Sequence, residues 1–192
     1  MKHLKIISSE LVLGALVALL SVLVALAAFQ SGMYDSQEGD LNVEGQKQLT
    51  DSNALYLEAN QFVIYDFTMY DGFYVNDGKD EDVATYYRDS FSESLVASME
   101  RPDGPFDDPY YEEMHGDASA TYDEAIVNFE KAQQAGDRAD KLQLSVLIFA
   151  VGLALAAYAS LLSMESPLRL SFGIGSIVAF IFGLFVYFGA LL

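Results

Sequence analysis

The chain consists of three uncharged apolar blocks and one long polar segment. The blocks run from Leu11 to Phe29, from Leu142 to Met164 and from Leu170 to Leu192. Because a helix rises about 1.5 Å per residue, roughly 20 residues cross a hydrocarbon core of about 30 Å, and each block reaches or nears that length. The pattern predicts three transmembrane helices.

The apolar blocks set the expected domain boundaries. We expect an N-terminal transmembrane helix, a signal anchor, at residues 1–30 and an acidic helical soluble domain at residues 31–140. A second transmembrane helix follows at residues 141–164, and residues 165–192 form a short turn and a third. A possible cleavage motif at residues 25–27 leaves a signal peptide as an alternative, but the first apolar block exceeds the roughly 7 to 15 residues usual in such peptides.

Helical periodicity continues into the polar segment. Residues 46–70 contain no glycine or proline and place apolar residues at helical spacing, which predicts a long helix into which the first span could continue. Gly72 and Gly78 are expected to bound a turn, after which Asp80 caps a second helix. The apolar ridge of this second helix comprises Val83, Tyr87, Phe91, Leu95 and Met99.

A proline-rich stretch and a further helix complete the polar segment. Pro102, Pro105 and Pro109 predict a loop through "RPDGPFDDPYYEEMHGD". The next helix carries a seam of alternating small and large residues at 4-3 spacing, which suits close antiparallel packing. The seam consists of Ala118, Tyr122, Ala125, Phe129, Ala132, Gly136 and Ala139. The predicted fold class is therefore an all-α membrane protein with three transmembrane helices and an acidic antiparallel helical hairpin or bundle inserted between the first and second.

Small residues also form stripes on the predicted spans. They are Gly14, Ala18, Ser21, Ala25 and Ala28 on the first, Gly152, Ala156 and Ser160 on the second, and Gly175, Ala179 and Gly183 on the third. Small residues allow helices to approach closely in lipid, so the stripes indicate either packing within the chain or an oligomer interface. No ionisable group lies in the interior of a span, which disfavours a transporter or pump acting alone.

Charge is concentrated between the first and second spans. Residues 30–141 hold 26 Asp and Glu against seven Lys and Arg, a net charge of −19. Such a field repels nucleic acid and anionic head groups and favours cations or basic partners, although adaptation to salt is an alternative explanation. The chain has no cysteine, which excludes disulfides, thiolate metal sites and cysteine nucleophiles.

Lysine and arginine near the spans predict the orientation in the membrane. Lys2 and Lys5 favour a cytoplasmic N-terminus, and Arg169 falls on the same side, while Arg138 and Lys141 count against it. Long acidic segments translocate with little regard to charge. We therefore expect a multi-pass protein of the plasma membrane with its acidic domain outside the cytoplasm.

Two groups of side chains are candidate ligands for a divalent cation. They are the acidic cluster Asp77, Asp80 and Asp82 and the pair Glu112 and His115, which are one helical turn apart. Di-iron bundles use such a carboxylate and histidine pair twice, whereas the only other histidine here is His3. A turn followed by a helix cap is the simpler explanation of the acidic cluster.

Tyrosine is concentrated in the polar segment, which holds ten of the twelve. Tyrosine suits both a protein interface and the core of a small bundle. The candidate interaction surface consists of Tyr70, Phe73, Tyr74, Tyr86 and Tyr87.

Two segments carry a resemblance to a known family. "TDSNALYLEANQF" at residues 50–62 and "GDRADKLQLSVLIFAVGLALAAYASLL" at residues 136–162 resemble an uncharacterised family of prokaryotic membrane proteins with one N-terminal span, a helical segment and a closing pair of spans. Members of that family often carry a Trp and a Tyr-Tyr-Gln in the first element, where this chain has no Trp and reads Leu55-Tyr56-Leu57. The resemblance implies a shared architecture and brings no activity.

The functional hypothesis follows from these features. Glycine-rich phosphate loops and a G-x-S-x-G motif are missing from the sequence, and we expect no enzymatic activity. We expect an interaction or scaffolding module that contacts the lipid bilayer and binds an unidentified protein or itself, without nucleic acid and without a cofactor. The alternatives are a cation-binding membrane protein and a pore-forming oligomer.

Overall fold

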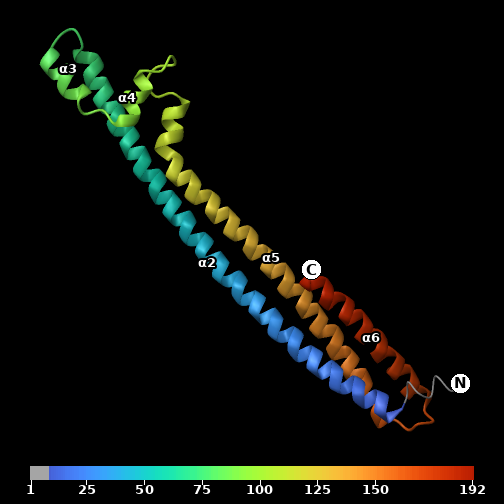
Figure 1. The fold of residues 1–192 in the computed structure, drawn as a ribbon. Helices are drawn as coiled ribbons and strands as arrows, with labels where there is room; N and C mark the ends of the chain where they lie inside the picture. Colours follow the sequence, from blue (N-terminus) through green and yellow to red (C-terminus); the bar gives the residue numbers. More distant parts are fainter. Residues whose placement is uncertain (1–8) are drawn as a thin grey trace. The chain divides into compact units, whose positions relative to one another are not determined.

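The computed structural model describes residues 9–192, so the predictions that rest on Lys2, His3 and Lys5 fall outside it. The described part contains five helices and no strand (Figure 1). They are α2 (Glu10–Asn76), α3 (Glu81–Arg88), α4 (Glu93–Met99), α5 (Asp108–Leu161) and α6 (Pro167–Leu191). Of these, α2, α5 and α6 are long and apolar enough to cross a membrane, which confirms the all-helical prediction and its three candidate spans.

Contacts within the chain divide it into two units, each described here by itself. The apolar unit comprises the chain up to Leu41 together with Glu130–Leu192. The acidic unit comprises Asn42–Phe129. Both units contain parts of α2 and α5, because each of these helices runs without a break past the boundary.

Helix α2 joins the first apolar block and the predicted 46–70 helix in one element of 67 residues. The helix continues past Gly72, so the prediction that Gly72 bounds a turn is wrong. Because Gly72 has no side chain, the ring of Tyr87 can occupy the space that a Cβ at residue 72 would take. Gly78 does lie in the turn that follows, at a φ of +71°, where a glycine avoids the steric cost of a side chain.

The helix predicted from Asp80 to Met99 is two helices. Asp80 caps α3 as expected, since its carboxylate accepts from the backbone N–H of Val83 at 3.2 Å. The chain then leaves the helix after Arg88, and Ser92 caps α4 by accepting from the N–H of Leu95 at 3.1 Å. A serine side chain that captures a backbone donor competes with helix continuation, which explains the break.

The loop predicted from the three prolines is shorter than expected, because α5 begins at Asp108. Pro109 lies in the first turn of this helix, where the missing N–H would have no helical acceptor. Asp107 precedes the helix and accepts from the N–H of Tyr110 at 3.1 Å. Residues 108–117, expected as loop, are therefore helical.

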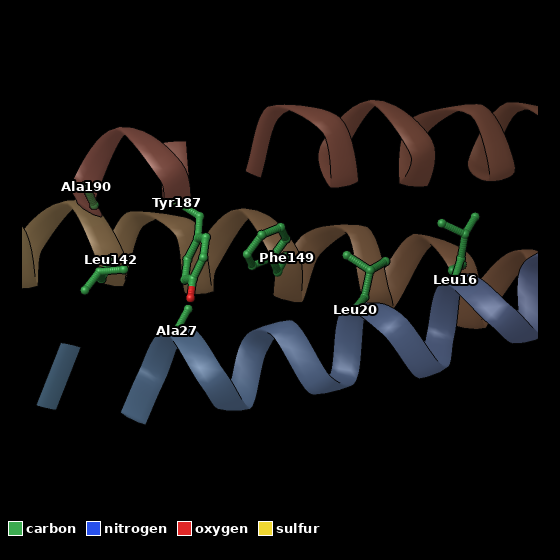
Figure 2. Close-up of a cluster of buried hydrophobic side chains, with 8 residues drawn as sticks. Leu16, Leu20, Ala27, Leu142, Phe149, Tyr187 and Ala190 are labelled. Carbon is green, nitrogen blue, oxygen red and sulfur yellow. The ribbon is translucent and has the colours of Figure 1, made fainter. Parts of the chain in front are cut away.

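The core of the apolar unit is formed by α2, α5 and α6 (Figure 2). Its buried side chains are Leu16, Leu20, Ala27, Leu142, Phe149, Ala156, Tyr187 and Ala190. Gly183 faces the ring of Phe149, and Gly152 faces Ala179, so small residues on α5 and α6 allow these helices to approach closely. Two polar contacts join the helices: Ser31 donates to the carbonyl of Ala139 at 3.1 Å, and Tyr187 donates to Gln30 at 2.7 Å.

The small-residue stripe on α2 behaves differently. Gly14, Ala18, Ser21, Ala25 and Ala28 are all exposed. Packing within the chain therefore accounts for Gly152 and Ala156 of α5 and for the stripe on α6, whereas Ser160 of α5 is exposed. The stripe on α2 has no partner helix among the described residues.

The seam predicted on α5 is confirmed for its alanines. Ala118, Ala125, Ala132 and Ala139 are buried at intervals of seven residues. Tyr122, expected between the first two, is 47% exposed, so this part of the prediction is wrong. In the acidic unit the ring of Phe129 lies against Gly45 of α2, where a Cβ would come within 2.9 Å of it.

Candidate functional site

A buried carboxylate, Asp66, holds together the part of the acidic unit where α2, α4 and the start of α5 meet. Its side chain is fully buried on α2, and it accepts three hydrogen bonds. The donors are the N–H of Ser92 at 3.1 Å, the hydroxyl of Ser92 at 2.5 Å and the hydroxyl of Tyr110 at 2.8 Å. Since Ser92 caps α4 and Tyr110 lies in the first turn of α5, Asp66 ties three helices together.

An aromatic cluster adjoins this network through Tyr110, whose ring meets Phe106 edge-on at 5.2 Å. Phe67 and Phe106 are stacked with ring centroids 4.0 Å apart, and Tyr70 meets Phe106 edge-on at 5.6 Å. Phe73 meets Phe91 edge-on at 5.7 Å. Offset and edge-on aromatic pairs add about 0.5–1.5 kcal/mol each to their burial. The loop between α4 and α5 is therefore held by packing as well as by hydrogen bonds.

An ion pair completes the loop, and three groups at the loop have shifted pKa values. Arg101 binds Asp107 through two hydrogen bonds, at 2.5 and 2.6 Å. The hydrogen bond from Arg101 holds the pKa of Asp107 below its usual value, and the same bond raises the pKa of Arg101. Burial, and then the bond to Asp66, raises the pKa of Tyr110, so this hydroxyl remains a donor well above neutral pH.

The predicted interaction surface divides into two groups. Tyr70 and Phe73 are half-buried in the aromatic cluster, and Tyr87 is half-buried over Gly72. Tyr74 and Tyr86 are 72% and 67% exposed. These two tyrosines are the members of the set that are free to meet another molecule.

The candidate metal ligands are placed as follows. Asp77, Asp80 and Asp82 are exposed around the start of α3, and Asp80 is engaged as its cap. Glu112 is exposed on α5, while His115 is half-buried. Among the residues described by the structure, no three His, Asp or Glu side chains form a group that could hold a metal ion. The structure thus adds no third ligand to the pair Glu112 and His115.

His115 borders a cavity of about 470 Å³ between α2 and α5 of the acidic unit. Its other lining residues are Ser52, Asn53, Tyr56, Ala118, Ser119 and Tyr122. The ring of His115 lies 4.9 Å from that of Tyr56, with Nδ1 2.9 Å from the carbonyl of Tyr111 and Nε2 3.3 Å from the amide of Asn60. Because the carbonyl of Tyr111 can only accept, Nδ1 carries a proton. The cavity has aromatic walls and carries hydroxyl groups.

A second cavity of about 470 Å³ lies beside the Asp66 network. It is lined by Glu58, Gln61, Phe62, Tyr65, Ser90 and Ser92. Phe62 and Tyr65 are 53% and 47% exposed, so their rings are available from solvent. Aromatic walls with a carboxylate at the edge suit a side chain that is both apolar and basic.

Asp66, Ser92 and Arg101 are absent from the site residues predicted from the sequence. A signal for Asp66 was present, because it follows Ala59 by seven residues and Val63 by three and thus falls on their buried helix face. A carboxylate on a buried face needs donors, which the sequence does not identify. The pairing with Ser92 and Tyr110 depends on how the loop folds back.

Comparisons with known proteins found no protein-family model, no curated protein and no solved structure that matches the chain. The resemblance in layout is therefore not supported by a match to a family.

Proposed function

We propose that the chain is a multi-pass protein of the plasma membrane whose acidic helical domain is an extracytoplasmic interaction module for a basic protein. The candidate spans in α2, α5 and α6 support the membrane placement. Contacts support the antiparallel hairpin, since Ser31 of α2 bonds Ala139 and Ser52 bonds Ala118, so that residue numbers rise on α2 as they fall on α5. No residue is assigned a catalytic role.

The observation that carries this proposal is the exposed apolar surface of the acidic unit. Leu57, Ile64, Tyr74, Val75 and Tyr86 are each more than half exposed. The unit holds 20 Asp and Glu against four Lys and Arg. Exposed aromatic and aliphatic groups are accessible to a partner, and the acidic surroundings favour a basic one. The Asp66 network favours binding because it orders the loop beforehand.

Affinity capture from native membranes tests this proposal with the full chain. We expect a basic protein to be recovered in stoichiometric amount by the wild type and by the control Val43→Ser, whose side chain is exposed elsewhere on α2. Recovery should fail with Tyr74→Ser/Tyr86→Ser and should weaken at high salt, which screens exposed charges. A partner retained by the double variant, or no stoichiometric partner at all, would contradict the proposal.

Self-association is a second candidate, favoured by the exposed small-residue stripe on α2. Small residues allow close contact between helices in lipid, and this stripe has no partner within the described chain. The absence of cysteine permits a direct test. We expect Ala18→Cys to form a disulfide-linked dimer in membranes and the buried Leu20→Cys to remain monomeric. Ala18→Ile should abolish the dimer in detergent, while Leu19→Ile should not.

The two other interpretations, a cation-binding protein and a pore-forming oligomer, predict different experimental results. A cation site at Glu112 and His115 or at Asp77, Asp80 and Asp82 predicts stoichiometric divalent metal that is lost in His115→Ala or Asp80→Ala. A pore-forming oligomer predicts conductance in planar bilayers. Positive results there would replace the interaction module as the best-supported function.

A further inference from the structure

A small groove in the apolar unit differs in charge from the rest of the polar segment. It has a volume of about 170 Å³ and lies between α2 and α5. It is lined by Tyr34, Gln37, Leu41, Lys131, Gln134, Ala135 and Arg138. Two of its lining residues are cationic, two carry amides and none is acidic, although residues 30–141 hold 26 acids against seven bases.

Neither cation of the groove forms an ion pair with a described carboxylate. Among the described residues the ion pairs are Lys47 with Glu44 and Arg101 with Asp107, and neither involves Lys131 or Arg138. The guanidinium of Arg138 lies 5.8 Å from the ring centroid of Tyr34, an arrangement that orients it by a cation–π contact. Both cations are exposed and one lies two helical turns before the other, on one face of α5.

The groove lies next to the apolar part of both helices. For helices along the membrane normal, Tyr34 follows Phe29 by about 8 Å and Arg138 precedes Leu142 by about 6 Å. A bilayer of about 40–45 Å with a core of about 30 Å has a head-group layer of roughly 5–8 Å on each side. Tyr34 and Arg138 therefore fall at the depth of lipid head groups, and Lys131 lies about 10 Å further out along α5, at the other end of the groove.

We propose that this groove binds the phosphate of a membrane lipid head group. Arg138 and Lys131 supply charged donors, and the amides of Gln37 and Gln134 supply neutral donors, which together match a phosphate monoanion. Glu38 packs against Gly136 of α5 and does not line the groove. The acidity of the whole segment repels anionic surfaces in general, so binding is confined to this one place.

Lipid binding to the full chain in neutral detergent tests the proposal without relying on its orientation in a membrane. Phosphatidylglycerol is titrated and bound lipid is counted by native mass spectrometry. We expect Lys131→Gln/Arg138→Gln to bind this lipid at least tenfold more weakly than the wild type, since each charged hydrogen bond lost accounts for about a factor of ten. The control Lys79→Gln/Arg88→Gln removes the same charge from exposed positions of the acidic unit and should bind as the wild type does.

Two further arms identify the ligand. Diacylglycerol with the same acyl chains lacks the phosphate and should not distinguish the variants. Inorganic phosphate should not displace the lipid, and displacement would assign the groove to free phosphate instead. Equal binding of phosphatidylglycerol to both double variants would overturn the proposal, provided that circular dichroism shows unchanged helix content. Arg138→Lys, which keeps the charge, should retain most of the binding.

Discussion

At the scale of single residues, Asp66 is a fully buried carboxylate outside the spans that joins α2 to α4 and α5. Burying a carboxylate is costly unless donors replace water, and here three donors from two residues do so. Removing the carboxylate leaves the hydroxyl of Tyr110 and the N–H of Ser92 without an acceptor inside the tip. The network is therefore sensitive to any change at this position.

Asp66→Ala should loosen the segment from Phe91 to Tyr110. We expect a loss of local stability of about 2–4 kcal/mol, because buried donors are left unsatisfied. Hydrogen exchange of the full chain in detergent measures this as faster exchange in that segment. The control Asp71→Ala lies on the same helix with an exposed side chain and should change exchange little. Equal protection in the two variants would show that Asp66 does not order the loop.

The pair of Arg101 and Asp107 should make the loop sensitive to acid. The pKa of Asp107 is lowered in the folded chain, so its contribution is present above the ordinary carboxyl pKa of about 4 and is lost as the pH falls through the lowered value. The thermal midpoint of Asp107→Asn should be below that of the wild type at pH 6, and the difference should shrink below pH 4. Asp103→Asn, an exposed change in the same loop, should show no such difference. A constant difference across pH would contradict the assignment.

At the scale of helices, glycine positions determine where neighbouring elements approach. Gly72 allows the ring of Tyr87 to lie on α2, whereas Gly39 on the same helix has nothing within 4 Å of the position of a Cβ. Both glycines lie inside a helix, where alanine is the better residue by about 0.5–1 kcal/mol. An alanine at residue 39 thus changes helix propensity alone, whereas an alanine at residue 72 also changes the packing against Tyr87.

Gly39→Ala should stabilise the full chain by about 0.5–1 kcal/mol, and Gly72→Ala should not. The added methyl group at residue 72 displaces Tyr87, which offsets the gain in propensity or exceeds it. Chemical denaturation in detergent, followed by far-ultraviolet circular dichroism, compares the two. In a Tyr87→Ala background the cost of Gly72→Ala should disappear, as expected for two residues in contact. Stabilisation by both single changes would show that the contact is not restrictive.

Helix periodicity predicted the long elements well and their ends less well. The apolar blocks are long and the alanines of α5 recur over many turns, so one exposed residue such as Tyr122 does not hide the pattern. The break before α4 depends on one capping serine, and the start of α5 depends on Pro109 occupying a first turn, which is compatible with either a loop or a helix. The site could be predicted only in part, because Asp66 finds its donors through residues far apart in the sequence.

At the scale of the whole molecule, the two units differ in chemistry. The apolar unit contains the apolar blocks of α2, α5 and α6, and the acidic unit contains most of the charge and many exposed aromatic groups. The proposed function therefore places the apolar unit in the membrane and assigns partner binding to the acidic unit. The proposed orientation places Lys79 of the acidic unit outside the cytoplasm and the turn between α5 and α6 inside.

Cysteine labelling of intact cells tests this orientation, because the native chain has no cysteine and gives no background. Lys79 and Ser163 are exposed, the latter between α5 and α6. We expect Lys79→Cys to react with a membrane-impermeant maleimide in intact cells and Ser163→Cys to react only after permeabilisation. Arg169 next to this turn favours its cytoplasmic side, whereas Arg138 and Lys141 favour the opposite. The reverse labelling pattern would invert the orientation and place the proposed lipid groove at the cytoplasmic leaflet. Labelling of both positions in intact cells would show that α5 does not carry the chain across the membrane.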